Sequence, residues 1–302
     1  MAADKRNFRS AYYEKVGCRG VEEKKSLELL MSEVPWDKVK LKQFCLRFSV
    51  PATFRNLVWK VVFDILPVYP DTHPFIWEQR STQYHDLMYA VDCLELERDS
   101  PGALYHAWLL EEGKLGPDPI FGCSPLYTFN FYETEVPFKA ISATLSQLYE
   151  DEVDVYWLTK SFCREVSHFQ QDIPKLQETF RLVLEKEDPI LYRLYFLQPY
   201  LSMEVLPLTK WFSCCFAGVL DETSLAKIWD KICCGCPKIL PYVGVILVIT
   251  IRRTLMQVST AEQLDKCIQE LPQQCEDVLA NKAVDLWQYY SSLPQGDPLT
   301  KK

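Results

Sequence analysis

Glycine is scarce in this chain, at ten of its 302 residues. That share is about half the average for globular proteins, which argues against a fold with many tight β-turns. Strand-like alternation of apolar and polar residues is also rare, whereas apolar residues recur at three- and four-residue spacing along most of the chain. Proline stands mostly between these periodic segments, where it begins or ends helices. The sequence therefore predicts an all-α fold, with about a dozen helices in a single large domain.

Features of several protein classes are missing. The net charge is −8, so the chain lacks the basic surface of a nucleic-acid-binding protein, and we expect no nucleic-acid partner. The N-terminal residues carry no apolar segment of a secretory signal, so we expect a cytoplasmic protein. The longest apolar run, residues 239–251, is too short to cross a bilayer and is followed by two arginines. We therefore predict a buried helix there and no membrane span.

Motifs of common enzymes and metal sites are missing as well. No two of the four histidines have the spacing of a zinc protease, and the serine hydrolase and phosphate-binding loop motifs are absent. Cys233 and Cys236 form a C-x-x-C pair, but Cys214 and Cys215 are adjacent, so a second zinc-binding pair is missing. Packing of reduced thiols is the favoured interpretation, and a zinc site is the alternative. We expect no metal ion and no cofactor.

One helix is predicted clearly between Pro51 and Pro67. Pro51 fits the first turn of a helix, Pro67 cannot continue it, and the apolar residues between them repeat at helical spacing. Arg55 and Trp59 lie four residues apart and therefore share one side of this helix. Farther along, the acidic residues at 150–154 precede another predicted helix. We interpret them as its solvated N-terminus, where negative charge is favourable, rather than as a metal site.

Four short motifs occur in one order along the chain. The first is R-x-x-x-W in the 51–67 helix, and a Tyr-Trp pair follows the acidic residues. W-x-x-x-x-F occupies residues 211–216, and I-W-D occupies residues 228–230. In this order and spacing they resemble the TBC domain, the fold of Rab GTPase-activating proteins. The resemblance implies that five motif residues serve the fold rather than catalysis: Arg55, Trp59, Trp211, Trp229 and Asp230.

The resemblance also sets the expected domain organisation. Residues 48–256 are expected to form the TBC domain. Residues 1–47 would be an N-terminal segment with short helices. Residues 257–302 would form C-terminal helices that pack on the domain and end in a frayed tail.

Active TBC domains resemble one another in using two catalytic fingers, an Arg from I-x-x-D-x-x-R and a Gln from Y-x-Q. An arginine finger is worth about 10³–10⁵ in rate. None of the arginines in this chain has Asp three residues before it, and none of the 16 tyrosines has Gln two residues after it. The resemblance therefore implies a protein with no catalytic residue. The alternative is an active Rab GTPase-activating protein with unconventional residues, for which Arg98 is the candidate finger.

The segments 6–27, 152–157 and 279–287 resemble one branch of the TBC family, the third subunit of the tuberous sclerosis complex. This implies a non-catalytic subunit that binds the hamartin coiled coil and, through it, tuberin. It would stabilise the complex in which tuberin accelerates GTP hydrolysis by Rheb, and so restrain signalling through the mTOR kinase complex. The resemblance also implies a peripheral location at lysosomal or vesicle membranes through the complex. Rab-family small GTPases are a further candidate partner.

Two candidate partner-binding faces stand out, and either could equally be core. One is a helix that places four apolar residues on one side: Phe138, Ile141, Leu145 and Leu148. The other is the irregular stretch at residues 114–135, with its aromatic residues Phe121, Tyr127, Phe129 and Phe131. A helical scaffold with an unrelated partner is the remaining alternative.

Overall fold

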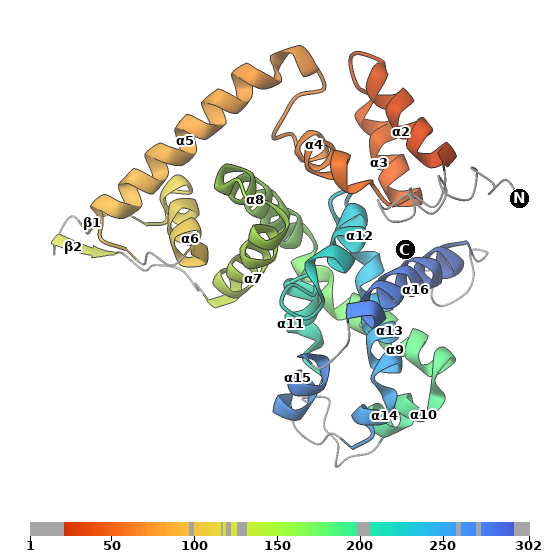
Figure 1. Cartoon of the computed structure of the whole chain (residues 1–302). Coiled ribbons are helices and arrows are strands. Elements are labelled where there is room, and N and C mark those ends of the chain that lie inside the picture. The colour runs from red at the N-terminus through yellow and green to blue at the C-terminus, as the bar shows by residue number, and fades with distance from the viewer. Residues whose placement is uncertain are drawn as a thin grey trace, which may run out of the picture. The chain divides into compact units, whose positions relative to one another are not determined.

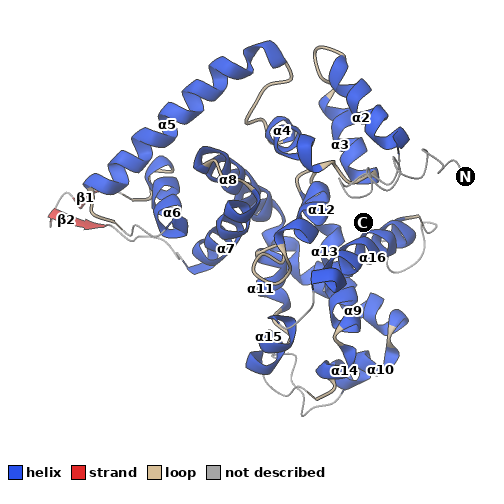
Figure 2. Ribbon diagram, in the orientation of Figure 1, coloured by secondary structure: helices blue, strands red, loops and turns tan. Residues whose placement is uncertain are grey.

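The computed structural model describes residues 21–96, 100–115, 117–118, 122–125, 132–197, 206–257, 261–269 and 273–292. Helices make up almost all of this part of the chain (Figures 1 and 2), which confirms the predicted all-α class. The chain divides into two compact units. The first extends to Glu165 and includes Cys233–Gly235, and the second begins at Val166 and contains the rest. The division falls inside the predicted 48–256 domain, whose boundaries stay a prediction.

The first unit is built from helices around the Trp59 core. Its α-helices are α2 (Val21–Ser32), α3 (Lys38–Arg47), α4 (Ala52–Val62), α5 (His73–Cys93), α6 (Ser100–Glu111), α7 (Tyr132–Leu148) and most of α8 (Glu152–Phe169), with the 3₁₀ turn η1 (Pro70–Thr72) before α5. Helix α6 packs against α5 and against α7. The stretch predicted to be irregular contains a small antiparallel ribbon of β1 (Pro117–Asp118) and β2 (Gly122–Pro125).

Helix α4 begins as the sequence predicts and ends earlier. Pro51 occupies the N-cap with an extended conformation, so its missing N–H costs nothing. The predicted end at Pro67 is wrong, because the helix stops at Val62. Asp64 adopts a left-handed conformation with φ 61°, and the amide of Ile65 turns back to donate to the Lys60 carbonyl at 2.8 Å. This closing turn satisfies the last carbonyls of the helix.

The second unit surrounds the apolar helix α13 (Leu240–Thr250), which packs against α9 (Ile173–Glu187) and α16 (Gln273–Ser291). Its other elements are η2 (Gln170–Asp172), α10 (Pro189–Tyr192), η3 (Arg193–Leu197), α11 (Leu208–Ser213), α12 (Glu222–Ile232), η5 (Pro237–Ile239), α14 (Arg252–Leu255) and α15 (Ala261–Gln269). Helix α13 is buried along most of its length, which confirms the buried helix predicted there. At the crossing with α9 the helices approach closely, because a Cβ added at Gly244 would lie 3.1 Å from the Phe180 ring, which would have to shift. None of the helices in the described ranges is long and apolar enough to span a membrane.

A pair of acidic residues joins α12 and α16 within the second unit. Asp221 caps α12 by accepting hydrogen bonds from the amides of Thr223 (3.0 Å) and Ser224 (2.9 Å). The Asp221 amide in turn donates to Oε2 of Glu276, at 2.5 Å. Burial, and then the neighbouring Asp221 carboxyl, raise the pKa of Glu276 to about 7 from its ordinary value of 4.5. Glu276 therefore binds a proton more tightly in the folded than in the unfolded chain.

We expect this pair to make the second unit less stable as the pH rises from 5 to 8. Because the pKa of Glu276 is higher in the folded than in the unfolded chain, its protonated form stabilises the fold. This contribution is complete below pH 4.5 and is lost as the pH rises past 7. A full shift of this size corresponds to about 3 kcal/mol, and we expect about 1–2 kcal/mol because solvent screens the site. Glu276→Gln, which mimics the protonated acid, should flatten this pH dependence in denaturant melts. Glu185→Gln, at an exposed position of α9, is the control and should retain it. Equal slopes for Glu276→Gln and the parent would refute the assignment.

Candidate interaction surface

Helix α5 is long and little buried. Of its 21 residues only Tyr84 and Val91 are buried. Two aromatic side chains face solvent, Phe75 with 64% and Tyr89 with 72% of their area exposed. They lie about four helical turns apart, so they share one side of the helix at about 21 Å separation. Both side chains therefore lie on the same exposed side of α5, where another molecule could reach them.

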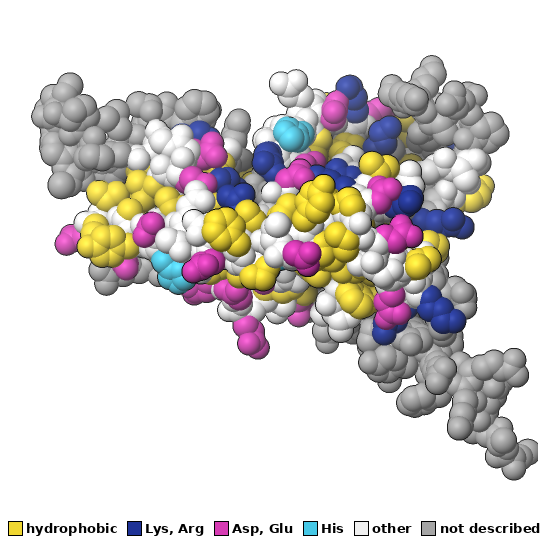
Figure 3. Space-filling model, turned by 90° about the horizontal axis from the view of Figure 1, so that it is seen from above, with side chains coloured by type: hydrophobic (Ala, Val, Ile, Leu, Met, Phe, Trp, Pro, Cys, Tyr) yellow, Lys and Arg dark blue, Asp and Glu magenta, His cyan; other side chains and the backbone are white. Residues whose placement is uncertain are grey.

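The exposed charges of α5 are all acidic. They are Glu78, Asp86 and Asp92. The one arginine of the helix, Arg80, is half-buried on the opposite side. In the view from above, hydrophobic and acidic side chains are interspersed with Lys, Arg and other side chains (Figure 3). We call the exposed side that carries Phe75, Glu78, Asp86 and Tyr89 the outer face of α5.

The opposite side of α5 makes polar contacts with α4, α6 and α8. Lys60 of α4 places its Nζ 3.6 Å from the centre of the Trp77 ring. The Arg80 guanidinium lies 4.4 Å from the Trp157 ring, and Trp157 Nε1 donates to the Arg80 carbonyl at 3.2 Å. The Tyr84 hydroxyl, whose pKa is raised by burial and then by its acceptor, donates to Glu152 at 3.0 Å. These contacts hold the inner side of α5 against the rest of the first unit. The four residues that define the outer face are exposed.

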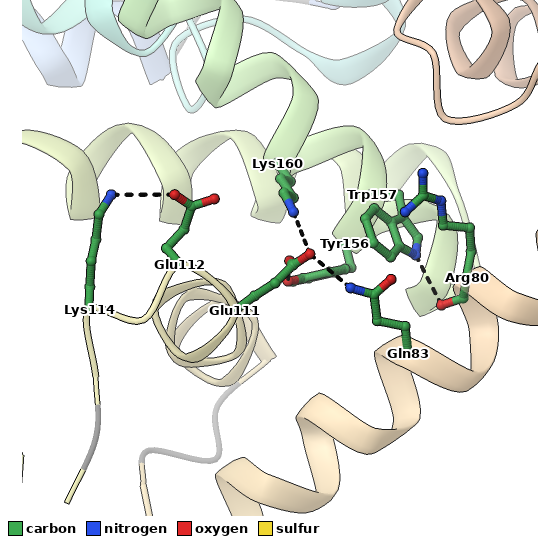
Figure 4. A network of polar contacts seen from close by, with 8 residues as sticks. All are labelled: Arg80, Gln83, Glu111, Glu112, Lys114, Tyr156, Trp157 and Lys160. Atoms are coloured by element: carbon green, nitrogen blue, oxygen red, sulfur yellow. Dashed lines mark hydrogen bonds and ion pairs between the residues drawn. The ribbon is translucent and has the colours of Figure 1, made fainter.

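Glu111, the last residue of α6, joins α5 to α8 (Figure 4). Its Oε1 accepts from Gln83 Nε2 of α5 at 3.0 Å and pairs with Lys160 Nζ of α8 at 2.5 Å. Its Oε2 accepts from the Tyr156 hydroxyl at 2.5 Å. Burial, and then the hydrogen bond to Glu111, raise the pKa of Tyr156 far above 10, so the phenol stays protonated and remains a donor. The neighbouring Glu112 contacts only Lys114 among the residues drawn, at 3.8 Å.

Comparison with known proteins identifies the family. The Rab-GTPase-TBC domain family matches residues 131–256. TBC1 domain family member 7 of Bos taurus is 39% identical over 293 residues, which cover 96% of this chain and 97% of that protein. The human protein of the same name is 38% identical with the same coverage. This chain belongs to the TBC domain family.

Solved structures share the TBC fold. The crystal structure of the Ypt/Rab-GAP domain of Gyp1p has a TM-score of 0.55 at 12% identity, covering 89% of this chain and 99% of that one. The Chlamydomonas flagellar RabGAP TBC domain has a TM-score of 0.51 at 15% identity, covering 93% of each chain. At this level of identity the likeness concerns the fold alone. The TBC architecture predicted from the motifs is therefore confirmed.

The TBC motif residues all lie in the core. Arg55 is 7% exposed and donates from Nη2 to the Val50 carbonyl at 2.5 Å. Trp59 is fully buried and meets Phe162 edge to face at 5.3 Å. In the second unit, Trp211 lies 5.7 Å from Phe216, and Trp229 and Asp230 are fully buried. Each therefore contacts the interior of its own unit rather than solvent.

The W-x-x-x-x-F motif forms the turn that ends α11. Cys215 and Phe216 both adopt left-handed conformations, with φ 50° and 62°. The Phe216 amide donates to the Trp211 carbonyl at 2.8 Å, which closes the end of α11. Trp229 Nε1 then donates to the Cys215 carbonyl at 3.0 Å. The motif and the I-W-D tryptophan thus stabilise one strained turn together.

The partner face predicted on α7 is corrected by the structure. Phe138, Ile141 and Leu145 are fully buried, and Leu148 is half-buried. The Phe138 ring stacks on Trp108 of α6 at 5.3 Å. These side chains form the α6–α7 core, so they do not offer a surface to a partner. The other predicted face falls on Phe121, Tyr127, Phe129 and Phe131, which lie outside the described residues.

The acidic residues at the start of α8 are only in part the solvated N-terminus that we predicted. Asp151 does cap the helix, accepting from the Val153 amide at 3.0 Å. Asp154, however, is 8% exposed. It forms an ion pair with Lys60 and accepts from Asn56 Nδ2 at 2.6 Å. Lys60 stands among the apolar residues Trp59 and Val61, which indicated a buried partner, but the sequence could not tell which of the four acidic residues it was.

The cysteines, and the arginine and glutamine of α5, bear on the two alternatives raised by the sequence, a zinc site and an active enzyme. No group of three or more His, Cys, Asp or Glu in the described ranges is arranged to hold a metal ion. Cys214, Cys215 and Cys233 are buried. Helix α5 does bring an arginine and a glutamine to one side, but Arg80 stacks on Trp157 and Gln83 binds Glu111. The candidate finger Arg98 lies outside the described residues.

Proposed function

We propose that this TBC protein is a non-catalytic subunit that binds a helical segment of hamartin and stabilises the hamartin–tuberin complex. The observation that carries the proposal is the absence of both finger motifs from a chain that matches TBC1 domain family member 7 along nearly its whole length. The motif residues that stabilise the TBC fold are present and buried, while the two finger motifs are absent. This combination is expected of a protein that needs the fold but not its catalytic activity. The commitment of Arg80 and Gln83 to contacts within the first unit supports the same conclusion.

The outer face of α5 is the proposed docking surface. Helices commonly bind other helices through a few apolar anchors along one face. Phe75 and Tyr89 supply two such anchors, and the acidic residues between and beside them favour a basic partner segment. A second copy of the same face would bring Glu78 and Asp86 against like charges, so the proposed occupant is a basic amphipathic helix of hamartin. This proposal replaces the α7 face.

The cellular role follows from the resemblance to the tuberous sclerosis complex subunit. Within such a complex, the fingers that accelerate GTP hydrolysis by Rheb belong to tuberin. This chain would act by holding hamartin in its assembled form, and so restrain signalling through the mTOR kinase complex. It would reach lysosomal or vesicle membranes through its partners.

The absence of catalysis is tested by single-turnover GTP hydrolysis on a panel of Rab-family GTPases and on Rheb. We expect the chain alone to change each rate by less than about twofold, because a functional arginine finger supplies about 10³–10⁵. Arg98→Ala should behave like the parent. A stimulation of a hundredfold or more that Arg98→Ala abolishes would contradict the proposal and establish the alternative, an active Rab GTPase-activating protein.

The docking surface is tested by titrating a hamartin coiled-coil fragment into the double variant Phe75→Asp/Tyr89→Asp. We expect its affinity to fall by at least about tenfold, because central aromatic anchors carry much of the binding energy of an interface. The thermal melt should be unchanged, since both side chains are exposed. Ile190→Asp in α10, which removes another exposed apolar side chain, is the control and should bind like the parent. Equal affinity of the double variant and the parent would exclude the outer face of α5.

A further inference from the structure

Several polar contacts join α5 to the neighbouring helices of its unit, in addition to its apolar packing. Only Tyr84 and Val91 of this helix are fully buried, and other apolar side chains such as Trp77 are half-buried. The polar and cation–π contacts of α5 come from residues on its inner side, which are Trp77, Arg80, Gln83 and Tyr84. Each of them meets a polar or charged group of α4, α6 or α8. Water can replace such contacts, so the orientation of α5 depends on how well they are held in place.

Glu111 of α6 binds Gln83 of α5 and also Tyr156 and Lys160 of α8. All three of its partners are donors: the Gln83 amide, the Lys160 ammonium and the Tyr156 hydroxyl. A carboxylate can accept from all three, and hydrogen bonds to a charged acceptor are the strong ones. The side chain of Glu111 is only 15% exposed, so solvent competes little. Figure 4 shows the carboxylate lying between the Gln83 amide and the Lys160 ammonium, with Tyr156 beside it.

We propose that Glu111 is a positioning residue, which fixes the orientation of α5 on α8 and thereby places the outer-face anchors for the partner. This inference rests on the docking role proposed above for α5. Gln83 lies near the middle of the helix, between Phe75 and Tyr89. A tilt of about 10° around this point would move each anchor by about 2 Å, given a rise of 1.5 Å per residue. A displacement of that size is enough to misalign two anchors in one interface.

The first test is hydrogen exchange of the free protein, which needs no partner. In Glu111→Gln the amide group brings one acceptor and two donors to a site that holds three donors. We expect amides in the middle of α5 to exchange about tenfold faster, the scale of losing one hydrogen bond to a charged group, while α4 and α8 exchange as in the parent. Glu112→Gln is the matched control. Glu112 follows Glu111 in the chain and pairs with Lys114 rather than with α5 in Figure 4, so this variant should leave the exchange rates of α5 unchanged.

A second variant keeps the test decisive if Glu111→Gln does not fold. Gln83→Leu removes only the α5 partner and leaves Tyr156 and Lys160 with their acceptor. It should accelerate exchange of α5 in the same way. Unchanged exchange of α5 in the folded variants would overturn the proposal. So would an equal acceleration of α4, α5 and α8, because that would mean a general loss of stability.

The binding arm uses the hamartin coiled-coil fragment on the full chain. We expect Glu111→Gln to raise the Kd about three- to tenfold, because a smaller fraction of the molecules has α5 in the competent orientation. Glu112→Gln should match the parent. If the parent itself does not bind, the proposed function fails, and the exchange result alone still decides whether Glu111 orients α5. If the parent binds and Glu111→Gln loosens α5 without weakening binding, the positioning role is refuted and the docking role stands.

Discussion

Trp59→Ala is expected to lower the free energy of unfolding of the first unit by about 3–5 kcal/mol, the usual range for a buried aromatic residue. Trp59 has no exposed surface and meets Phe162 and Tyr149 edge to face, at 5.3 and 6.3 Å. Phe63 lies against the same Phe162 ring at 4.8 Å, so the cavity would open at the centre of an aromatic cluster. A denaturant melt followed by tryptophan fluorescence and circular dichroism measures the change.

The control for this variant is Trp59→Phe, which keeps an aromatic ring and should lose clearly less stability. Hamartin binding should be lost in Trp59→Ala only to the extent that the unit is unfolded. A variant that melts like the parent yet fails to bind would make Trp59 a contact residue and contradict its structural role.

Asp154→Ala is expected to be of similar severity, at about 3–5 kcal/mol, because it leaves the Lys60 charge buried without its carboxylate. Lys60 and Asp154 are each 8% exposed, and the ion pair joins α4 to α8. Asn56 would lose its acceptor as well. Since Lys60 also lies over the Trp77 ring, we expect α5 to loosen near its N-terminus in the same variant.

Two further variants show how much of this loss of stability comes from leaving the Lys60 charge buried without a partner, and how much from the ion pair itself. Lys60→Met/Asp154→Leu, which replaces both charged side chains by apolar ones of similar length, should be much closer to the parent than Asp154→Ala. Asp172→Ala breaks the exposed pair with Lys175, where the side chains are 49% and 82% exposed, and should cost less than about 1 kcal/mol. Equal losses from Asp154→Ala and Asp172→Ala would show that the Lys60–Asp154 pair is not buried in solution.

Periodicity and motifs predicted the parts of the fold that local chemistry determines. The start of α4 follows from the ring of Pro51, and the buried helix α13 follows from an uninterrupted apolar run. The family was predicted from motif residues whose burial is now seen, such as Trp59 and Trp229. These signals lie in single segments, so a single sequence contains them.

Long-range partners could not be predicted from the same patterns. The α4 helix ends at Val62, and Asp64 just beyond it has a left-handed conformation. No Pro or Gly stands at this point of the sequence, so the end of the helix could not be predicted there. The apolar side of α7 is the same whether it meets α6 or a partner, and the structure assigns it to α6 through Phe138 and Trp108. The outer face of α5 was missed because apolar residues occur all around that helix, so no stripe marks which of them are left exposed.

The most direct test of the account is hydrogen exchange of the full chain with and without a hamartin coiled-coil fragment. A non-catalytic subunit that docks through α5 should show protection of residues 73–93, and that protection should disappear in Phe75→Asp/Tyr89→Asp. The α6–α7 core around Phe138 should exchange equally slowly in both states, because it is buried before the partner arrives. Protection confined to other helices, or no protection at a saturating concentration of the fragment, would contradict the central claim.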